Sequence, residues 1–293
     1  MRAWPIALTM VFAALVCSLA HAQSKQAPPH QVSAPQPAAR SSDCDEGALS
    51  LTARWGDALS EGFDAPGLLL RGAAFSSSAA LIVSGQDHRL RVVGGRDATA
   101  LKPIATPTVL AGYLLPLTGP VVHWVARASG SCRAATMGTV QTQATADTLL
   151  EVGLLKVLSG RPFPLHGGSP EDPTRFSHPR WAQEFHPLRP DRGWSWPSGH
   201  VAVAAALATS TAVSQPELWP WIPGAALTTT IALGMWSGEH HWPSDILSGA
   251  SIGIAHGLGA ARAHRDRGRA GATMSWQLVP WTEGRGVWLI GPW

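Results

Sequence analysis

Apolar stretches of helical length, separated by glycine and proline, constrain the fold of this chain more than any other feature of its sequence. From Glu46 onward they follow one another with almost none of the period-two alternation that marks a strand. Such stretches bury their apolar faces by packing against one another, so the sequence predicts an all-α fold, built as a helical bundle. The expected helices are Ala48–Leu59, Gly67–Val83, Pro107–Ala126, Ala134–Leu158, Val201–Val213, Ile222–Ser237 and Ser244–Ala263.

The two ends of the chain depart from this pattern. Residues 1–22 carry one positive side chain, then an apolar run, then small residues at the positions that a signal peptidase reads. They predict a signal peptide and export to the periplasm or cell envelope; a retained membrane anchor is the alternative. The Pro-rich segment 23–45 is expected to be a flexible leader, and 268–293 to form a short C-terminal β-hairpin. The helical domain is therefore expected over 46–267.

Three cysteines are present, and Cys17 lies inside the expected signal peptide. After export, Cys44 and Cys132 would stand in an oxidising compartment, so a disulfide between them is one expectation. Two free, buried thiols are the other, and the sequence does not choose between them.

The composition excludes some classes of protein. The formal net charge is +3 and charged residues make up 14% of the chain, so no broad basic face indicates nucleic acid as a partner. A mean hydropathy of +0.05 is too apolar for a disordered chain and too low for a bundle of many membrane-spanning helices. The uncharged stretch Thr108–Val125 is long enough to cross a bilayer, but a buried core helix explains it equally well. Contact with a membrane surface stays open, and no protein partner is predicted.

The sequence Pro197-Ser198-Gly199-His200 stands directly before an apolar helix. Serine is a preferred N-cap, and the unpaired backbone N–H groups of a helix start, with the positive end of the helix dipole, bind anions. His200 would lie beside such an anion. An ordinary serine-capped helix with an incidental histidine is the simpler interpretation of this segment alone.

His241 and Asp245 stand four residues apart at the start of the last predicted helix, where both can lie on one side. A carboxylate that accepts a hydrogen bond from one imidazole nitrogen leaves the other nitrogen free, and such an imidazole can attack phosphorus. Asp245 could instead only stabilise its helix terminus. His240 and His241 could also be metal ligands, but His200 is the one obvious candidate for a third ligand.

Lys156 lies in the last turn of a predicted helix that Gly160 ends, and Arg161 follows directly. Two cations at a helix exit could clamp a phosphate. A lysine that merely complements the helix dipole is a common alternative.

Taken in chain order, these three segments resemble the motifs of the type 2 phosphatidic acid phosphatase and vanadium haloperoxidase superfamily. Its pattern is a Lys followed by Arg-Pro, then Pro-Ser-Gly-His, then Ser-Arg and a His with an Asp four residues later. The resemblance covers about Ala134–Ala263 and implies the helical bundle of that superfamily. It implies that His241 is a nucleophile that forms a phosphohistidine, that Asp245 orients it, and that His200 protonates the leaving alkoxide. It also implies phosphate ligands, namely Lys156, Ser198 and the backbone N–H of Gly199.

This chain departs from the superfamily's pattern at two arginines. Phe163 stands at the position of the first and Met235 at that of the second. Arg161 is expected to replace one of them, and Arg192 or Arg189 the other, although an ordinary solvated loop is the simpler interpretation of these last two.

The sequence therefore predicts a phosphatase that needs no metal and no cofactor and acts on a lipid phosphate or a small phosphomonoester. A non-catalytic anion-binding envelope protein of the same fold is an alternative, which Phe163 and Met235 favour. A vanadate-dependent haloperoxidase is less favoured, because vanadate must be held by several cations.

Overall fold

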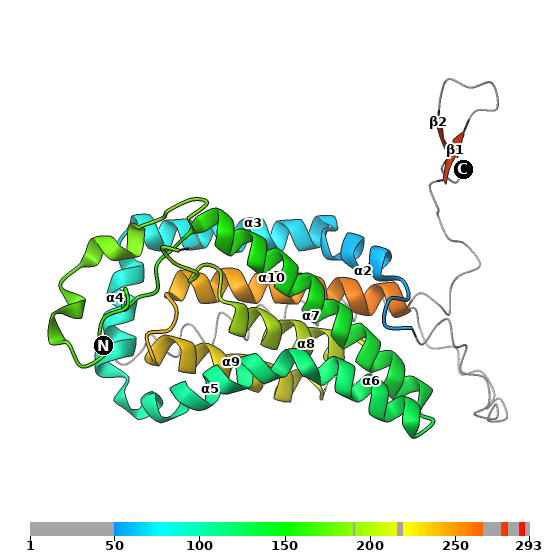
Figure 1. Ribbon diagram of the computed structural model, residues 1–293, viewed down its shortest axis with the longest axis horizontal. Coiled ribbons are helices and arrows are strands. Elements are labelled where there is room, and N and C mark those ends of the chain that lie inside the picture. The colour runs from blue at the N-terminus through cyan, green and yellow to red at the C-terminus, as the bar shows by residue number, and fades with distance from the viewer. Residues whose placement is uncertain (1–49, 190, 216–218, 266–276, 281–286, 291–293) are drawn as a thin grey trace.

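The computed structural model describes residues 50–189, 191–215, 219–265, 277–280 and 287–290, and the all-α prediction is confirmed in them (Figure 1). The α-helices are α2 (Trp55–Gly62), α3 (Ala65–Val83), α4 (Gln86–Val92), α5 (Lys102–Leu114), α6 (Thr118–Ala128), α7 (Cys132–Ser159), α8 (Gly199–Val213), α9 (Trp221–Ser237) and α10 (Pro243–Arg265). Shorter helical segments are η1 (Val93–Asp97), η2 (Thr99–Leu101), η3 (Leu115–Leu117), η4 (Pro173–Phe176) and η5 (Pro179–Gln183).

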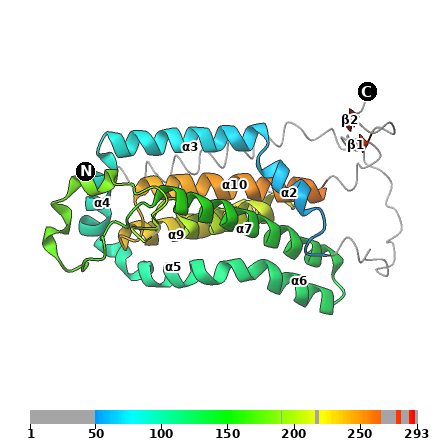
Figure 2. The same ribbon diagram turned by 45° about the horizontal axis from the view of Figure 1, so that its top comes forward.

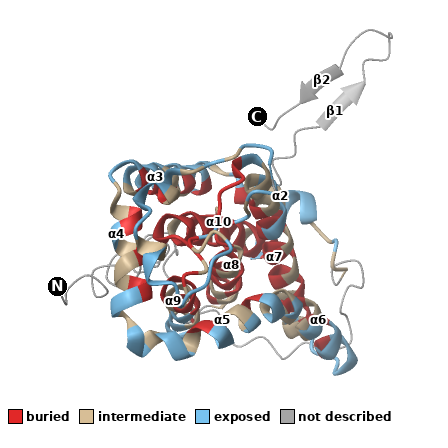
Figure 3. Cartoon of the chain, turned by 60° about the vertical axis from the view of Figure 1, so that its left-hand side comes forward, coloured by how far each residue is buried: buried red, intermediate tan, exposed pale blue. Residues whose placement is uncertain are grey.

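Helix α10 is the centre of the bundle. All but three of its 23 residues are buried, and it packs against α2, α3, α7 and α8 (Figure 3). Small residues allow this close packing: a Cβ at Gly253 would lie 2.0 Å from the carbonyl oxygen of Ala202, and one at Gly249 would lie 2.3 Å from that of Ser198. The backbone of α8 therefore touches that of α10, which brings the starts of the two helices together.

The remaining helices lie on two sides of this centre. Figure 2 shows α3 on one side and α5 with α6 on the other, with α7, α9 and α10 between them. Two segments are long and apolar enough to cross a membrane, Ala65–Val83 and Thr99–Ala128, and in each only 22% of the apolar window is buried inside the bundle.

Most predicted helices are present, but the helix expected over Pro107–Ala126 is divided into α5 and α6 by η3, and the first helix begins at Trp55. The structure also adds a helix that the sequence analysis missed. Helix α4 has the sequence QDHRLRV, which shows no apolar face. Its buried residues are Asp87, His88 and Arg91, and the charges of Asp87 and Arg91 are paired inside the protein with Arg161 and Glu239. A search for apolar periodicity cannot find a helix whose buried face is charged.

Several predictions fall wholly or partly outside the described residues: the signal peptide, the leader, and the turn of the C-terminal hairpin. Gln277–Pro280 (β1) and Val287–Ile290 (β2) pair as antiparallel strands, with Gln277 opposite Ile290. Cys132 is disulfide-bonded, and both other cysteines lie outside the described residues, so the pairing with Cys44 stays a prediction.

Candidate active site

A cavity of about 700 Å³ opens where α5, α7 and α8 meet the turn before α10. Its polar lining includes Lys156, His200 and His241, together with the backbone at Gly199. The structure thus gathers, from three remote parts of the chain, four of the residues that the sequence analysis singled out. Apolar side chains form the rest of the wall, among them those of Tyr113, Leu149, Val152, Phe163, Trp194 and Val203.

His241 lies at the cavity wall with Asp245 behind it. Its Nδ1 is 3.5 Å from Oδ2 of Asp245, which is an ion-pair distance and longer than an ordinary hydrogen bond. The same Oδ2 accepts hydrogen bonds from the backbone N–H of Trp242, at 3.0 Å, and from the hydroxyl of Ser195, at 2.5 Å. Asp245 is completely buried, and these contacts fix the orientation of its carboxylate beside the imidazole.

The pKa values of this pair shift in directions that suit a neutral histidine beside an ionised acid. Burial lowers the pKa of His241, and Asp245 opposes that shift only in part. For Asp245 burial alone would raise the pKa, but the charge of Arg161 and the contacts with His241 and Ser195 outweigh it, so the pKa of Asp245 is lowered. At neutral pH the imidazole of His241 therefore keeps a free lone pair, which a nucleophile requires.

His200 faces His241 across the cavity, with ring centroids 6.0 Å apart. Helix α5 holds it in place: the ring hydrogen-bonds the backbone of Val109 and packs edge-on against Tyr113. Gly112 is required for this approach, because a Cβ there would lie 1.9 Å from Cδ2 of His200. Burial, followed by the charges of His241 and Lys156, lowers the pKa of His200 to about 4.

The start of α8 and Lys156 form one side of the cavity. Ser198 is the N-cap of α8, where its side chain accepts a hydrogen bond from the N–H of Val201 at 3.5 Å. Lys156 donates to the carbonyl oxygens of Trp194 and, at 3.3 Å, Ser195. Burial lowers the pKa of Lys156 to about 8, against the attraction of Asp245. A helix start and one cation thus face the two histidines, an arrangement that can bind an oxyanion.

Comparison with known proteins identifies this arrangement. Residues 137–269 match the family described as the PAP2 superfamily. This match places the segment that carries both histidines in the PAP2 superfamily. The match contains α8, α9 and α10 and most of α7, whereas α2 to α6 lie outside it.

One curated relative is the lipid A 1-phosphatase of Porphyromonas gingivalis, which is 39% identical to this chain over 77 residues. The aligned part covers 25% of this chain and 17% of the relative, so the chain matches less than a fifth of that protein's length. No solved structure matches the chain. Membership of the PAP2 superfamily and this relative together support a phosphatase function.

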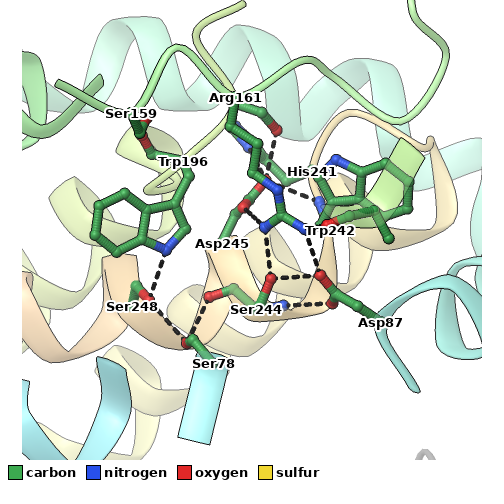
Figure 4. A network of polar contacts seen from close by, with 12 residues as sticks. Ser78, Asp87, Ser159, Arg161, Trp196, His241, Trp242, Ser244, Asp245 and Ser248 are labelled. Atoms are coloured by element: carbon green, nitrogen blue, oxygen red, sulfur yellow. Dashed lines mark hydrogen bonds and ion pairs between the residues drawn. The ribbon is translucent and has the colours of Figure 1, made fainter. Parts of the chain in front are cut away.

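Arg161 lies behind the site rather than in it (Figure 4). Gly160 ends α7 in a left-handed conformation, with φ of 54°, and the chain then turns inward. The side chain of Arg161 is completely buried, and its Nη1 donates to Asp245 and Ser244 while Nη2 donates to Asp87 and the carbonyl of Ala182, each at 2.6 Å. Its guanidinium thus binds the two acids and is absent from the cavity lining.

The other expected replacement arginine, Arg192, is also outside the cavity. Its side chain is 61% exposed, with Nε 3.8 Å from Asp191. Arg189 pairs with the same aspartate at 2.9 Å. Among the described residues that line the cavity, Lys156 is the sole lysine or arginine.

Apolar side chains occupy the places of the two superfamily arginines. Phe163 forms part of the cavity wall, and its ring centroid is 5.8 Å from that of His241. Met235 is fully buried in an apolar cluster with Val201, Ile231 and Ile246. The cavity is thus less cationic and more apolar than the superfamily's motifs imply.

The sequence analysis missed the contributions of α4 and α5. Gly112, Tyr113 and Val109 come from α5, which had been considered only as a core or membrane helix, and Asp87 comes from α4. Nothing in their local sequence indicates an active site, because their role depends on contacts with residues remote in the chain, such as those of Asp87 with Arg161 and Ser244. His240, considered earlier as a metal ligand, lines the cavity, and no group of three or more metal-ligating side chains is found among the described residues.

The lowered pKa of Lys156 makes a pH dependence of anion binding testable. The ammonium group is charged below a pH of about 8 and loses its charge above it, so the dissociation constant of sulfate should rise by about tenfold per pH unit above that value. Calorimetric titration with sulfate between pH 7 and 10 measures this, because sulfate itself does not change charge there. In Lys156→Arg the cation persists, so affinity should stay nearly constant. The same loss of affinity in both proteins would contradict the assignment.

Proposed function

We propose that this PAP2 member hydrolyses phosphate monoesters through a phosphohistidine intermediate on His241. The observation that carries the proposal is that His241 and His200 face one another across a cavity whose wall also holds Lys156 and the start of α8. A covalent nucleophile, a proton donor and an anion site are the parts that such a reaction requires.

In the first step the Nε2 lone pair of His241 attacks phosphorus, and the bond from phosphorus to the ester oxygen breaks. Asp245 holds the proton on Nδ1 and stabilises the positive charge that the ring gains. The departing alkoxide takes a proton from His200 and leaves as the alcohol. The pKa of His200 is about 4 in the free protein, and the bound phosphate raises it, since a nearby anion favours the charged imidazolium.

In the second step His200, now neutral, accepts a proton from water as the water oxygen attacks the phosphohistidine. The phosphorus–nitrogen bond breaks, inorganic phosphate leaves, and both histidines return to their starting state. Lys156 and the backbone N–H groups at Gly199 stabilise the charge on the phosphoryl oxygens in both steps. This sequence of steps uses no metal ion.

The apolar wall of the cavity favours a substrate with an apolar group beside the phosphate, such as a lipid phosphate. Tyr113 and Leu149 line the cavity and are also 69% and 42% exposed, so the cavity wall continues into the outer surface of α5 and α7. That surface carries further exposed apolar residues: Leu110, Leu114, Leu117, Leu150 and Leu154. The protein works at the membrane surface of the cell envelope, where this face meets lipid.

A non-catalytic anion-binding protein of the same fold is the second candidate. The specific observation in its favour is that Lys156 is the sole lysine or arginine among the described residues of the cavity wall, where the superfamily's motifs imply further arginines. The two candidates differ in one measurable property, which is turnover.

His241→Ala should abolish hydrolysis of p-nitrophenyl phosphate, because no other group is placed to form the covalent intermediate. Wild-type activity should survive EDTA and be inhibited by vanadate. Acid-quenched wild-type protein incubated with ³²P-labelled substrate should carry an acid-labile phosphate that is absent from the variant. A folded wild-type protein without turnover on any phosphate ester would support the non-catalytic candidate instead.

His200→Ala should slow hydrolysis of alkyl phosphates by about 100- to 10,000-fold, the usual contribution of a general acid. p-Nitrophenyl phosphate should be affected much less, because p-nitrophenolate leaves without a proton. Steady-state kinetics on the two substrates gives the ratio. An equal loss on both substrates would rule out His200 as the proton donor.

Alkyl phosphates of increasing chain length should be hydrolysed with rising kcat/KM, by up to about fourfold per added methylene until the apolar wall is covered. Leu149→Ala should reduce this dependence, because Leu149 lines the cavity. Leu150→Ala is the matched control, since the neighbouring side chain is 66% exposed and lies outside the cavity wall. A kcat/KM that is independent of chain length would exclude the apolar wall as a substrate contact.

A further inference from the structure

Asp87 on α4 is a completely buried acid close to Asp245, the carboxylate beside His241. The mechanism above gives Asp87 no role. Its Oδ2 accepts hydrogen bonds from Nη2 of Arg161 at 2.6 Å and from the hydroxyl of Ser244 at 2.5 Å. Its Oδ1 accepts one from the backbone N–H of Ser244 at 2.9 Å. Figure 4 shows Asp87 entering this network from the side opposite Trp196. Both carboxylate oxygens therefore accept hydrogen bonds from residues next to Asp245: Arg161 also binds Asp245, and Ser244 directly precedes it in the chain.

Arg161 is shared between two acids. Nη1 binds Oδ1 of Asp245 and Nη2 binds Oδ2 of Asp87, so one planar guanidinium fixes the distance and orientation between the two carboxylates. All three side chains are fully buried. With both acids ionised, the single cation between them leaves a formal charge of −1 next to His241.

We propose that Asp87 is a positioning residue for phosphoryl transfer, which acts on His241 through Arg161, Ser244 and Asp245. This inference rests on the proposed function of His241 as the nucleophile. Asp87 has two effects. It holds the start of α10, so that Asp245 points at the imidazole, and it accepts one of the guanidinium's four hydrogen bonds.

The second effect is electrostatic. With Asp87 ionised, the charge of Arg161 is divided between two carboxylates, and Asp245 keeps enough negative charge to stabilise a positive imidazole ring. With Asp87 neutral, Arg161 is compensated by Asp245 alone, and the ring loses that stabilisation. Burial raises the pKa of Asp87, and Arg161 opposes this shift, so the charge of Asp87 depends on its guanidinium partner.

Asp87→Asn tests the proposal because asparagine keeps the shape and an acceptor oxygen but removes the charge. We expect kcat on p-nitrophenyl phosphate to fall by about 10- to 100-fold, with KM nearly unchanged. This is the loss typical of mutating a residue that orients a metal ligand, and Asp87 would act on Asp245 in the same indirect way. The matched control is Asp147→Asn. Asp147 is also a buried acid, but it accepts a hydrogen bond from Trp55 at 2.6 Å and does not line the cavity. It should lower the melting temperature without changing kcat more than twofold.

A second readout does not require turnover. The pKa of His241, measured from ¹⁵N-histidine spectra and assigned with His241→Ala, should be lower in Asp87→Asn than in wild type, because a negative charge has been removed. It should be unchanged in Asp147→Asn. The titratable groups that face His241 are Asp245, Lys156, His200 and His240, and those that face Asp87 are Arg161 and Asp245. These groups are the same in wild type and in both variants.

Ser244→Ala provides a milder change if Asp87→Asn does not fold. It removes the hydroxyl that binds both Asp87 and Arg161 but leaves every charge in place, so kcat should fall by about two- to fivefold. The proposal is overturned if a folded Asp87→Asn or Ser244→Ala protein keeps wild-type kcat and His241 titration, or if Asp147→Asn loses as much kcat. Wild-type protein without turnover would contradict the proposed function. The pKa of His241 in wild type and in Asp87→Asn would still test the link from Asp87 to His241.

Discussion

The rest of the site depends on one buried guanidinium. Arg161 lies between Asp87 and Asp245, and the three side chains have no contact with solvent. Removing one member of such a group is expected to cost about 3–5 kcal/mol, because an unpaired charge would remain buried, whereas replacing the whole group by apolar residues often costs nothing. The group is therefore better explained by what it positions than by the stability it adds. It positions the start of α10, and with it the carboxylate behind His241.

Under the proposed function, backbone groups and one lysine would carry most of the anion binding in this site. In the superfamily's pattern arginines stand where Phe163 and Met235 stand here, and neither Arg161 nor Arg192 reaches the cavity to replace them. The attraction for phosphate then depends on Lys156, whose pKa of about 8 lies close to neutral, and on the start of α8. Under the proposed function, a site with so little fixed positive charge would discriminate among substrates through their apolar part, for which Phe163, Tyr113 and Leu149 provide the surface.

The bundle has two exposed apolar surfaces, which differ in their position relative to the cavity. The outer face of α5 and α7 leads directly into the cavity through Tyr113 and Leu149. Helix α3 is equally apolar and equally exposed, but it lies on the opposite side of the bundle (Figure 2), where it packs mainly against α10 and pairs with α7 through Arg71 and Glu151. A membrane on the side of α5 would place lipid beside the phosphate site, and the same helix holds His200 through Val109 and Gly112.

The sequence by itself determined most helices and the motif residues, because both depend on the spacing of residues that are close together in the chain. Apolar stretches and their Gly and Pro boundaries predicted α7 to α10 within a few residues, and the spacing of His241 and Asp245 follows from one helical turn. Only the tertiary structure decided the role of Arg161, which the sequence analysis had assigned to phosphate and which binds Asp87 instead. It also revealed α4 and the part that α5 plays at His200. These features depend on pairing between groups remote in the chain, and neither a buried charge nor a glycine that admits a distant ring leaves a periodic signal in the sequence around it.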